Sequence, residues 1–301
     1  MRINDAIRKA VVFLGIVDDK ESFVPYGTGF VALWPTEIPG GYHIYLVTAH
    51  HVLKDIKSSK RDLIVRIDGR DGNTALGRIA AVDEWILHAT NPLCDIAVIP
   101  FVASPETFDF KGVDLSKNAV SAEFIEEYDM GLGDAVFTAG LLTRHFGISR
   151  NISIVRNGNI AAMPDEPVDL GDLGQQEVYL IESRSIGGLS GSPVFLSAGP
   201  RVRKGMFVID SQDDIERLLG VNIGLFQVQP SSDRARTDEA DRRDHFLELM
   251  SSGIAVVVPV ERVIEIIRDT PKLIEHRKKQ LQASRLRKGA LDDLDVRQRP
   301  I

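Results

Sequence analysis

The stretch LVTAHHVL at residues 46–53 decides the fold, because it is a strand-like apolar run that ends in two histidines. Short apolar, β-branched segments recur on both sides of it, separated by turn-forming glycine, proline, asparagine and aspartate. Many short strands with turn residues between them are typical of all-β barrels and sandwiches. The candidate strands are residues 11–17, 27–33, 43–48, 63–67, 77–82, 95–101, 134–140, 152–160, 177–182, 192–196, 219–226 and 253–259.

A polar stretch divides these candidate strands into two groups. The sequence therefore predicts an all-β fold of two six-stranded antiparallel barrels, with a C-terminal helix. Helical spacing of apolar side chains between Val263 and Ile274 indicates the helix, and Pro271 interrupts it. The predicted parts are an N-terminal barrel at 1–110, a connecting segment at 111–130, a C-terminal barrel at 131–268 and a basic helical or disordered tail at 269–301.

Two further segments join the histidine pair as carriers of chemistry. In CDIAVI at 94–99, Asp95 opens an apolar strand, and in GGLSGSPVF at 187–195, Ser190 lies in a glycine-rich turn. A serine hydroxyl becomes a useful nucleophile when an imidazole takes its proton, and a carboxylate fixes the tautomer of that imidazole. Glycine-rich turns let two backbone N–H groups converge on the oxyanion that forms. The three segments together predict nucleophilic catalysis.

These segments resemble the motifs of the chymotrypsin-like (trypsin-fold) serine peptidases, in the family's order of histidine, aspartate and serine. TAHH at 48–51 is similar to the family's Thr-Ala-x-His, and DIAVI at 95–99 to its Asp-Ile-Ala-Leu-Ile. GLSGSP at 188–193 is similar to its Gly-Asn/Asp-Ser-Gly-Gly/Ser-Pro, and GTGF at 27–30 to the Gly-x-Gly-Phe strand before the histidine. The specific resemblance is to bacterial branches, the glutamyl-endopeptidase-like and high-temperature-requirement-like enzymes.

The resemblance implies a catalytic triad and an oxyanion hole. In it, His51 is the base, Asp95 is the carboxylate that orients His51, and Ser190 is the nucleophile. The backbone N–H groups of Gly188 and Ser190 form the oxyanion hole. The chain is then a serine endopeptidase that acts on a protein or peptide through an acyl-enzyme, without a metal or an organic cofactor.

The resemblance is weakest around the nucleophile and the substrate pocket. Leu189 stands where relatives carry a polar residue, and an apolar side chain makes none of the polar contacts that hold such a turn. The sequence therefore does not predict a preformed oxyanion hole. The pocket would be lined by Arg184, Asn222 and Gly224. A cation at Arg184 would favour an acidic substrate side chain, whereas the simpler interpretation is a solvated arginine in a loop.

Composition limits the partners and the location of the protein. Hydrophobic residues make up 44% and charged residues 26% of the chain, as in ordinary globular proteins. The net charge of -7 argues against nucleic acid as the main partner. No run approaches the ~20 apolar residues of a transmembrane helix. A single cysteine, Cys94, excludes an internal disulfide and fits a reducing compartment, so we expect a cytoplasmic protein.

Several other interpretations remain open. A trypsin-fold binding or scaffold module, weak or inactive as a catalyst, is the main alternative function. A regulatory protein partner is a further hypothesis, acting on the surface loops predicted at 164–176 and 229–243. The basic stretch 268–288 suits an anionic partner or simply a solvated helix face. The pair of His50 and His51 lacks the second cluster that a zinc site needs, and His50 is expected to point away along the strand.

Overall fold

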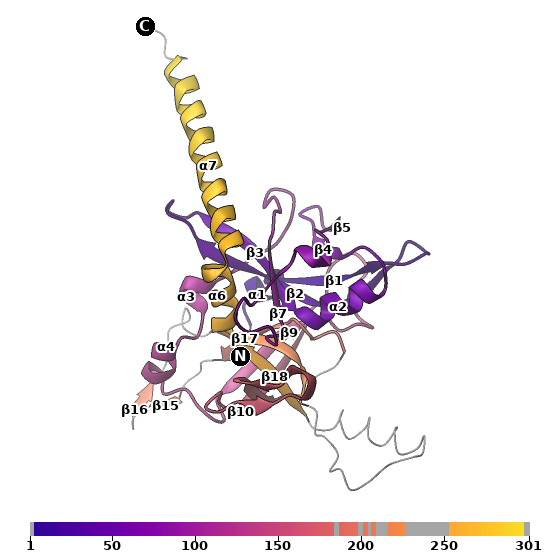
Figure 1. The fold of residues 1–301 in the computed structure, drawn as a ribbon, viewed down its shortest axis with the longest axis vertical. Helices are drawn as coiled ribbons and strands as arrows, with labels where there is room; N and C mark the ends of the chain where they lie inside the picture. Colours follow the sequence, from indigo (N-terminus) through magenta and orange to yellow (C-terminus); the bar gives the residue numbers. More distant parts are fainter. Residues whose placement is uncertain are drawn as a thin grey trace.

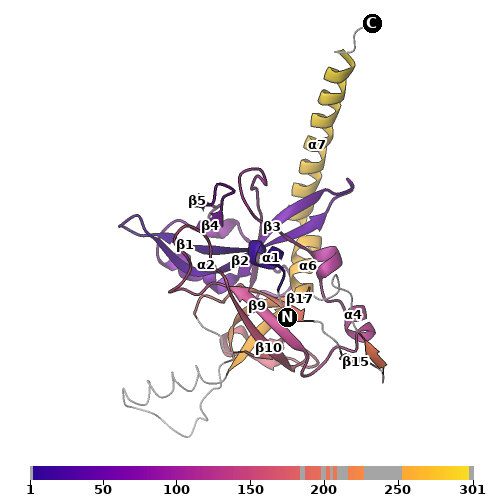
Figure 2. The ribbon, with the colours of Figure 1, turned by 180° about the vertical axis from the view of Figure 1, so that it is seen from behind.

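The computed structural model describes residues 3–183, 187–197, 201–203, 206–208, 216–226 and 253–297. It contains two β units that pack against each other, with the long helix α7 extending away from both (Figure 1). Figure 2 shows the same arrangement from behind, with α7 again leaving the body of the molecule. No helix among the described residues is long and apolar enough to span a membrane.

The first unit is an eight-stranded sheet in the order β5-β4-β1-β2-β3-β7-β6, and β8 adds to β2 in parallel. The sequence prediction had six strands in this part of the chain. The two additional strands, β6 and β8, have two residues each and leave too little periodicity to detect. The strands of the first unit are β1 (Val11–Val17), β2 (Phe23–Pro35), β3 (Tyr42–Ala49), β4 (Ile64–Asp68), β5 (Thr74–Arg78), β6 (Ile86–Leu87), β7 (Ile96–Pro100) and β8 (Val113–Asp114).

The second unit is a closed antiparallel barrel of six strands in the order β10-β13-β18-β17-β14-β9. The predicted all-β fold class, with a six-stranded barrel and a C-terminal helix, is confirmed. The barrel strands are β9 (Ala135–Gly140), β10 (Ile154–Ala162), β13 (Tyr179–Glu182), β14 (Pro193–Ser197), β17 (Glu216–Leu225) and β18 (Ile254–Pro259). Two small hairpins lie outside the barrel, β11 (Val168–Asp169) with β12 (Gln175–Gln176), and β15 (Arg201–Arg203) with β16 (Met206–Val208).

Short helices fill the connections, and two longer ones end the described chain. Pro271 begins α7, where its fixed φ suits the first helical turn and its missing N–H is not needed. The helix continues to Arg297, so most of the tail expected to be helical or disordered is helical. The helices are α1 (Asp5–Ala10), α2 (His50–Ser58), η1 (Val82–Glu84), α3 (Leu115–Asn118), α4 (Ala122–Glu127), η2 (Gly171–Leu173), α6 (Val260–Asp269) and α7 (Pro271–Arg297).

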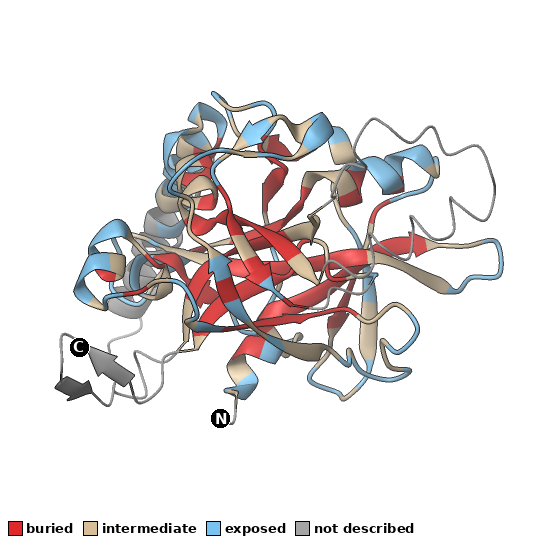
Figure 3. Cartoon of the chain, turned by 90° about the horizontal axis from the view of Figure 1, so that it is seen from below, coloured by how far each residue is buried: buried red, intermediate tan, exposed pale blue. Residues whose placement is uncertain are grey.

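The two units share a continuous apolar core. One cluster of buried side chains joins Phe30 and Tyr45 of the first sheet to Phe137 and Phe195 of the barrel, and reaches Leu273 of α7. The buried residues lie along the central strands of both units (Figure 3). A close-packed core transmits small displacements between its parts. The shared core therefore fixes how the sheet and the barrel face each other, which matters for any site between them.

Candidate active site

The pairing of β3 with β7 brings His51 and Asp95 together. These strands are antiparallel, and Ala49 at the end of β3 faces Ile96 at the start of β7. The residue just before β7 therefore lies beside the residues just after β3. Asp95 Oδ2 is 2.5 Å from His51 Nδ1, and Asp95 Oδ1 accepts a hydrogen bond of 2.8 Å from the backbone N–H of His51.

The backbone contact explains why the chain turns into a helix at this point. His50 begins α2, and the first N–H groups of a helix have no partner within the helix. Asp95 supplies these partners, because its backbone oxygen accepts from His50 N–H and its carboxylate accepts from His51 N–H. A carboxylate at a helix N-terminus is also favoured by the helix dipole. His50 therefore starts a helix, and the expected continuation of the strand through His50 was wrong.

The contacts of Asp95 set the protonation of His51. Asp95 is buried, whereas the His51 side chain keeps 35% of its surface exposed. A carboxylate only accepts hydrogen bonds, so Nδ1 carries the proton and Nε2 is left free to accept one. Burial lowers the pKa of His51, but the hydrogen bond and charge of Asp95, with a smaller contribution from Asp55, outweigh burial and raise it. The ring is thus oriented and made more basic.

Ser190 lies with this pair on one cavity. His51, Asp95 and Ser190 all line a cavity of ≈ 740 Å³. The Ser190 turn is held by the backbone, since Ser190 O accepts from Thr28 N at 2.9 Å and Leu189 O accepts from Ser192 N at 3.0 Å. The structure therefore brings the three predicted side chains to the same cavity from segments that are far apart in sequence.

Leu189 is buried within the molecule, with 1% of its surface exposed. Its side chain packs against Gly140 of β9, so closely that a Cβ added at Gly140 would lie 2.9 Å from Leu189 Cδ2. The side chain thus anchors the turn by burial, and the polar contacts come from other residues. Burying a leucine side chain contributes about 1.5–3 kcal/mol.

Of the predicted pocket residues, Gly224 lines the cavity and Asn222 does not. Asn222 is 2% exposed, and its Oδ1 accepts a hydrogen bond of 2.9 Å from Gly224 N. This contact supports a bulge between Asn222 and Gly224, where the register of β17 against β18 shifts. Asn222 therefore shapes the wall from behind. Arg184 lies outside the described residues.

The cavity also has walls that the sequence did not predict. One wall is apolar and comes from Ile223, Leu225, Phe226 and Val256. A second part of the lining comes from η2 and its neighbours, in the segment interpreted as a surface loop. A stretch of mixed aspartate, glycine and leucine carries no sequence signal for folding over a cavity. The residues from this segment are Asp169, Leu170, Gly171, Asp172 and Leu173.

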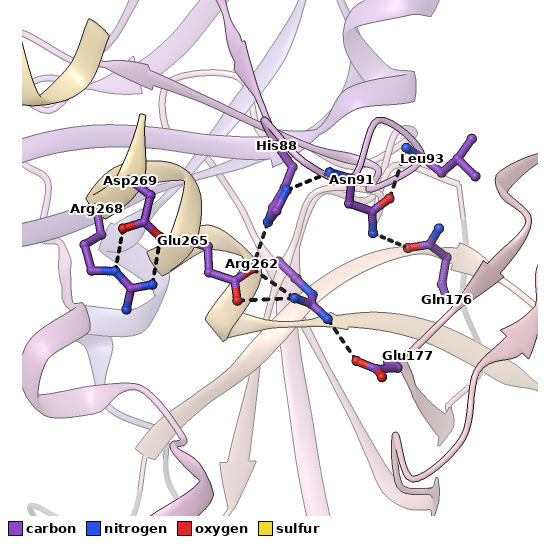
Figure 4. A network of polar contacts seen from close by, with 9 residues as sticks. All are labelled: His88, Asn91, Leu93, Gln176, Glu177, Arg262, Glu265, Arg268 and Asp269. Atoms are coloured by element: carbon purple, nitrogen blue, oxygen red, sulfur yellow. Dashed lines mark hydrogen bonds and ion pairs between the residues drawn. The ribbon is translucent and has the colours of Figure 1, made fainter. Parts of the chain in front are cut away.

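A polar network ties this segment to the loop that carries Asp95 (Figure 4). Asn91 Nδ2 donates to Gln176 Oε1 at 3.0 Å, and Asn91 O accepts from Cys94 N at 3.1 Å. Asn91 N also donates to His88 Nδ1, which leaves Nε2 of His88 to donate to Glu265 Oε2 of α6 at 2.8 Å. The network therefore joins the loop before Asp95 to the segment 164–176 through Gln176, and to α6 through Glu265.

Further contacts extend the network to the rest of α6. Arg262 bonds Glu265 at 3.0 Å and Glu177 at 2.9 Å, so α6 is joined to the chain that follows β12. Cys94, next to Asp95, is a buried thiol whose pKa burial raises to about 12. A thiol with that pKa is not a nucleophile at neutral pH. Cys94 therefore serves as packing.

Comparisons with known proteins add little to this geometry. The sequence matches no protein-family model and no curated protein. Similar solved structures include the crystal structure of Deg5, with 16% identity and a TM-score of 0.41 over 73% of this chain and 81% of that one. Another is the crystal structure of a serine-to-alanine mutant of Rv3671c from M. tuberculosis H37Rv in an inactive form, with 15% identity and a TM-score of 0.43 over 87% of each chain. At these values the function must be inferred from the side chains themselves.

Proposed function

We propose that the chain is a serine endopeptidase that cleaves peptide bonds through an acyl-enzyme at Ser190. The observation that carries the proposal is the double contact of Asp95 with the ring and the backbone of His51, on a cavity that Ser190 also lines. Burying a carboxylate costs free energy unless the carboxylate is paired. A histidine–carboxylate pair that shares a cavity with a half-buried serine is the arrangement expected to activate a hydroxyl.

The proposed reaction uses Nε2 of His51 as the base, because Asp95 contacts the other ring nitrogen, Nδ1. His51 Nε2 takes the proton as Ser190 Oγ attacks the scissile carbonyl, and Asp95 stabilises the imidazolium that forms. The Gly188 and Ser190 N–H groups stabilise the oxyanion. Collapse of the tetrahedral adduct breaks the C–N bond, and the leaving amine takes the proton from His51. Water, deprotonated by His51, then attacks the acyl carbon. Collapse of this second adduct breaks the C–O bond to Ser190 Oγ, which takes the proton back from His51.

The test is turnover of a proteome-derived peptide pool by the purified chain. We expect cleavage by the wild type and none by Ser190→Ala, with Ser192→Ala as the matched control in the same turn. Ser192 is fully buried and does not line the cavity, so its loss leaves the nucleophile in place. Peptides that bind without being cut by the wild type would overturn the proposal and favour a binding module.

A regulatory partner is part of the proposal, with the segment 164–176 as its point of action. This segment contributes five residues to the cavity, so a partner that moved it would change access to His51. The second predicted loop, 229–243, lies outside the described residues. Activity that rises when a cell extract is added supports gating, and full activity of the purified chain removes the need for it.

A further inference from the structure

Thr28 contacts the turn at residues 187–192 that carries Ser190, the nucleophile turn, through both its backbone and its side chain. It lies in β2 of the first unit and is fully buried. Its N–H donates to Ser190 O at 2.9 Å, and its Oγ1 donates to Gly188 O at 2.7 Å. The same Oγ1 accepts from Leu141 N at 2.9 Å, so one hydroxyl satisfies a donor and an acceptor of the barrel.

These contacts fix both ends of the turn. The carbonyl groups of Gly188 and Ser190 are held by Thr28, and the carbonyl between them, that of Leu189, is held by Ser192 N. In a trans peptide the N–H points opposite to the C=O, so bonding the Leu189 carbonyl aims the N–H of Ser190 the other way. The turn therefore has no freedom to rotate either flanking carbonyl without breaking a hydrogen bond to Thr28.

The turn also approaches β2 and β3 too closely for any side chain at Gly191. Gly191 has φ +84°, and a Cβ there would overlap the carbonyl oxygen of Thr28 and the hydroxyl of Thr48. Thr48 Oγ1 donates to Thr28 O at 2.7 Å, and Thr48 lies in β3, the strand that ends just before His51. The chain of contacts therefore runs from the nucleophile turn through Thr28 to the strand that places the base.

We propose that the Thr28 hydroxyl is a positioning group for the oxyanion hole, supplying the polar anchor that Leu189 cannot. This inference rests on the proposed function, because an oxyanion hole matters only if Ser190 forms an acyl-enzyme. The hydroxyl touches neither substrate nor reacting atoms. It acts by holding Gly188 O, and so the Gly188–Leu189 peptide, which adjoins the Leu189–Ser190 peptide whose N–H must lie in place before charge develops.

The test uses variants that separate the hydroxyl from the shape of the side chain. Thr28→Val keeps the branched shape and the backbone N–H but loses the donor, which leaves Gly188 O and Leu141 N without this partner. We expect kcat on a reporter peptide to fall about 10²-fold, the effect of displacing or losing one oxyanion donor, with KM unchanged. Thr28→Ser retains the hydroxyl and is expected to keep kcat within a few-fold of the wild type.

One control variant and one substitute variant make the result decisive. Thr138→Val removes the hydroxyl of another buried threonine, in β9, and is expected to leave kcat unchanged. Thr28→Ala replaces the valine variant if that variant does not fold. If neither folds, Thr28 serves stability alone and the inference is overturned. It is also overturned if a folded Thr28→Val keeps wild-type kcat, or if Thr28→Ser is as impaired as Thr28→Val.

Failure of this inference is distinguishable from failure of the proposed function. A fluorophosphonate probe applied to the wild type tests the function first. If Ser190 of the wild type does not react, the proposed function fails. If it reacts, and the Thr28 variants turn over substrate as the wild type does, only the role of Thr28 fails.

Discussion

The base and the nucleophile of the candidate site are held in different ways. His51 and Asp95 come from paired strands of one sheet, and a single carboxylate bonds both the ring and the backbone of His51. The turn of Ser190 belongs to the barrel, yet Thr28 of the other unit holds both of its ends. The base is therefore positioned within one unit, whereas the nucleophile depends on how the two units pack.

Asp95→Asn tests the half of the site that lies within one unit, and it should have the largest effect. The amide can no longer fix the Nδ1–H tautomer of His51 or stabilise the imidazolium, so we expect kcat to fall about 10⁴-fold. Steady-state kinetics on a reporter peptide measures it. The size of the side chain is conserved, so circular dichroism should match the wild type. A loss of less than tenfold would contradict the role given to the pair.

Arg66→Met tests the half of the site that depends on packing between the units. Arg66 lies in β4, is 3% exposed, and donates to the backbone oxygens of Phe146, Gly147 and Ile148 at 2.8–3.0 Å. These three residues belong to the barrel loop that follows β9. Without the guanidinium these carbonyls lose a partner, at about 1–3 kcal/mol for a buried group left unsatisfied.

Urea unfolding of Arg66→Met gives the free energy of unfolding, and limited proteolysis reports the barrel loop. We expect lower stability and faster cleavage in the loop, with a smaller loss of kcat than in Asp95→Asn. The matched control is Arg78→Met on the neighbouring β5, whose ion pair with Asp62 is solvent-exposed and contributes little. Equal stability of the two variants would show that the loop does not depend on Arg66.

The pH dependence sharpens the comparison, because it reports only the base. A general base must be neutral, so kcat/KM should rise with pH through a His51 pKa that lies above the ordinary value. A raised pKa also means that the ion pair stabilises the fold fully below the unfolded pKa of histidine, and loses this contribution as pH rises through the folded pKa. Activity should therefore rise over the window in which this part of the stability falls.

Measuring kcat/KM against pH for the wild type and Asp95→Asn checks this expectation. The variant lacks the carboxylate charge, so the midpoint of its profile should move to lower pH. Thr28→Val, in contrast, should lower the plateau and leave the midpoint where it is. A midpoint that stays fixed in Asp95→Asn would separate the titrating group from the His51–Asp95 pair.

The smallest expected effect concerns the charge of the substrate. Asp169 and Asp172 line the cavity from the segment before β12, so the described wall favours basic over acidic substrate side chains. A cation at Arg184 would favour the opposite preference, although the simpler interpretation of Arg184 from the sequence is a solvated arginine in a loop. Both aspartates are exposed, so Asp172→Asn should reduce the preference for lysine over glutamate only a few-fold, as expected of surface charges.

Competing lysine- and glutamate-containing peptides against each other gives this ratio directly. Asp165→Asn is the control, because Asp165 belongs to the same segment but does not line the cavity. A wild type that prefers glutamate would instead point to Arg184.

The sequence predicted the parts of the fold that depend on local patterns. The β-branched runs at Val11–Val17 and Ile254–Pro259 were located almost to the residue, because alternation and turn residues mark them. The strand expected at 77–82 lies instead at Thr74–Arg78, since its side chains are half-exposed and its position is set by pairing with β4. The helix at His50 was missed because the carboxylate that caps it comes from Asp95, a tertiary contact.

The candidate site, like the fold, has features that local sequence patterns reveal and features that depend on tertiary contacts. The types and order of His51, Asp95 and Ser190 are visible in the sequence as motifs, whereas their roles stay predictions until activity is measured. In the sequence, Thr28 is only the variable position of a Gly-x-Gly-Phe motif, because its side-chain hydrogen bonds go to residues of the other unit. The cavity wall at Asp169–Leu173 carries no periodic signal at all.

The most direct test of this account is the site of covalent modification. The full chain is treated with a fluorophosphonate, digested, and mapped by mass spectrometry. The account predicts one adduct on the Oγ of Ser190, formed more slowly in His51→Ala and absent in Ser190→Ala. An adduct on another residue, or none on a folded wild type, would contradict it.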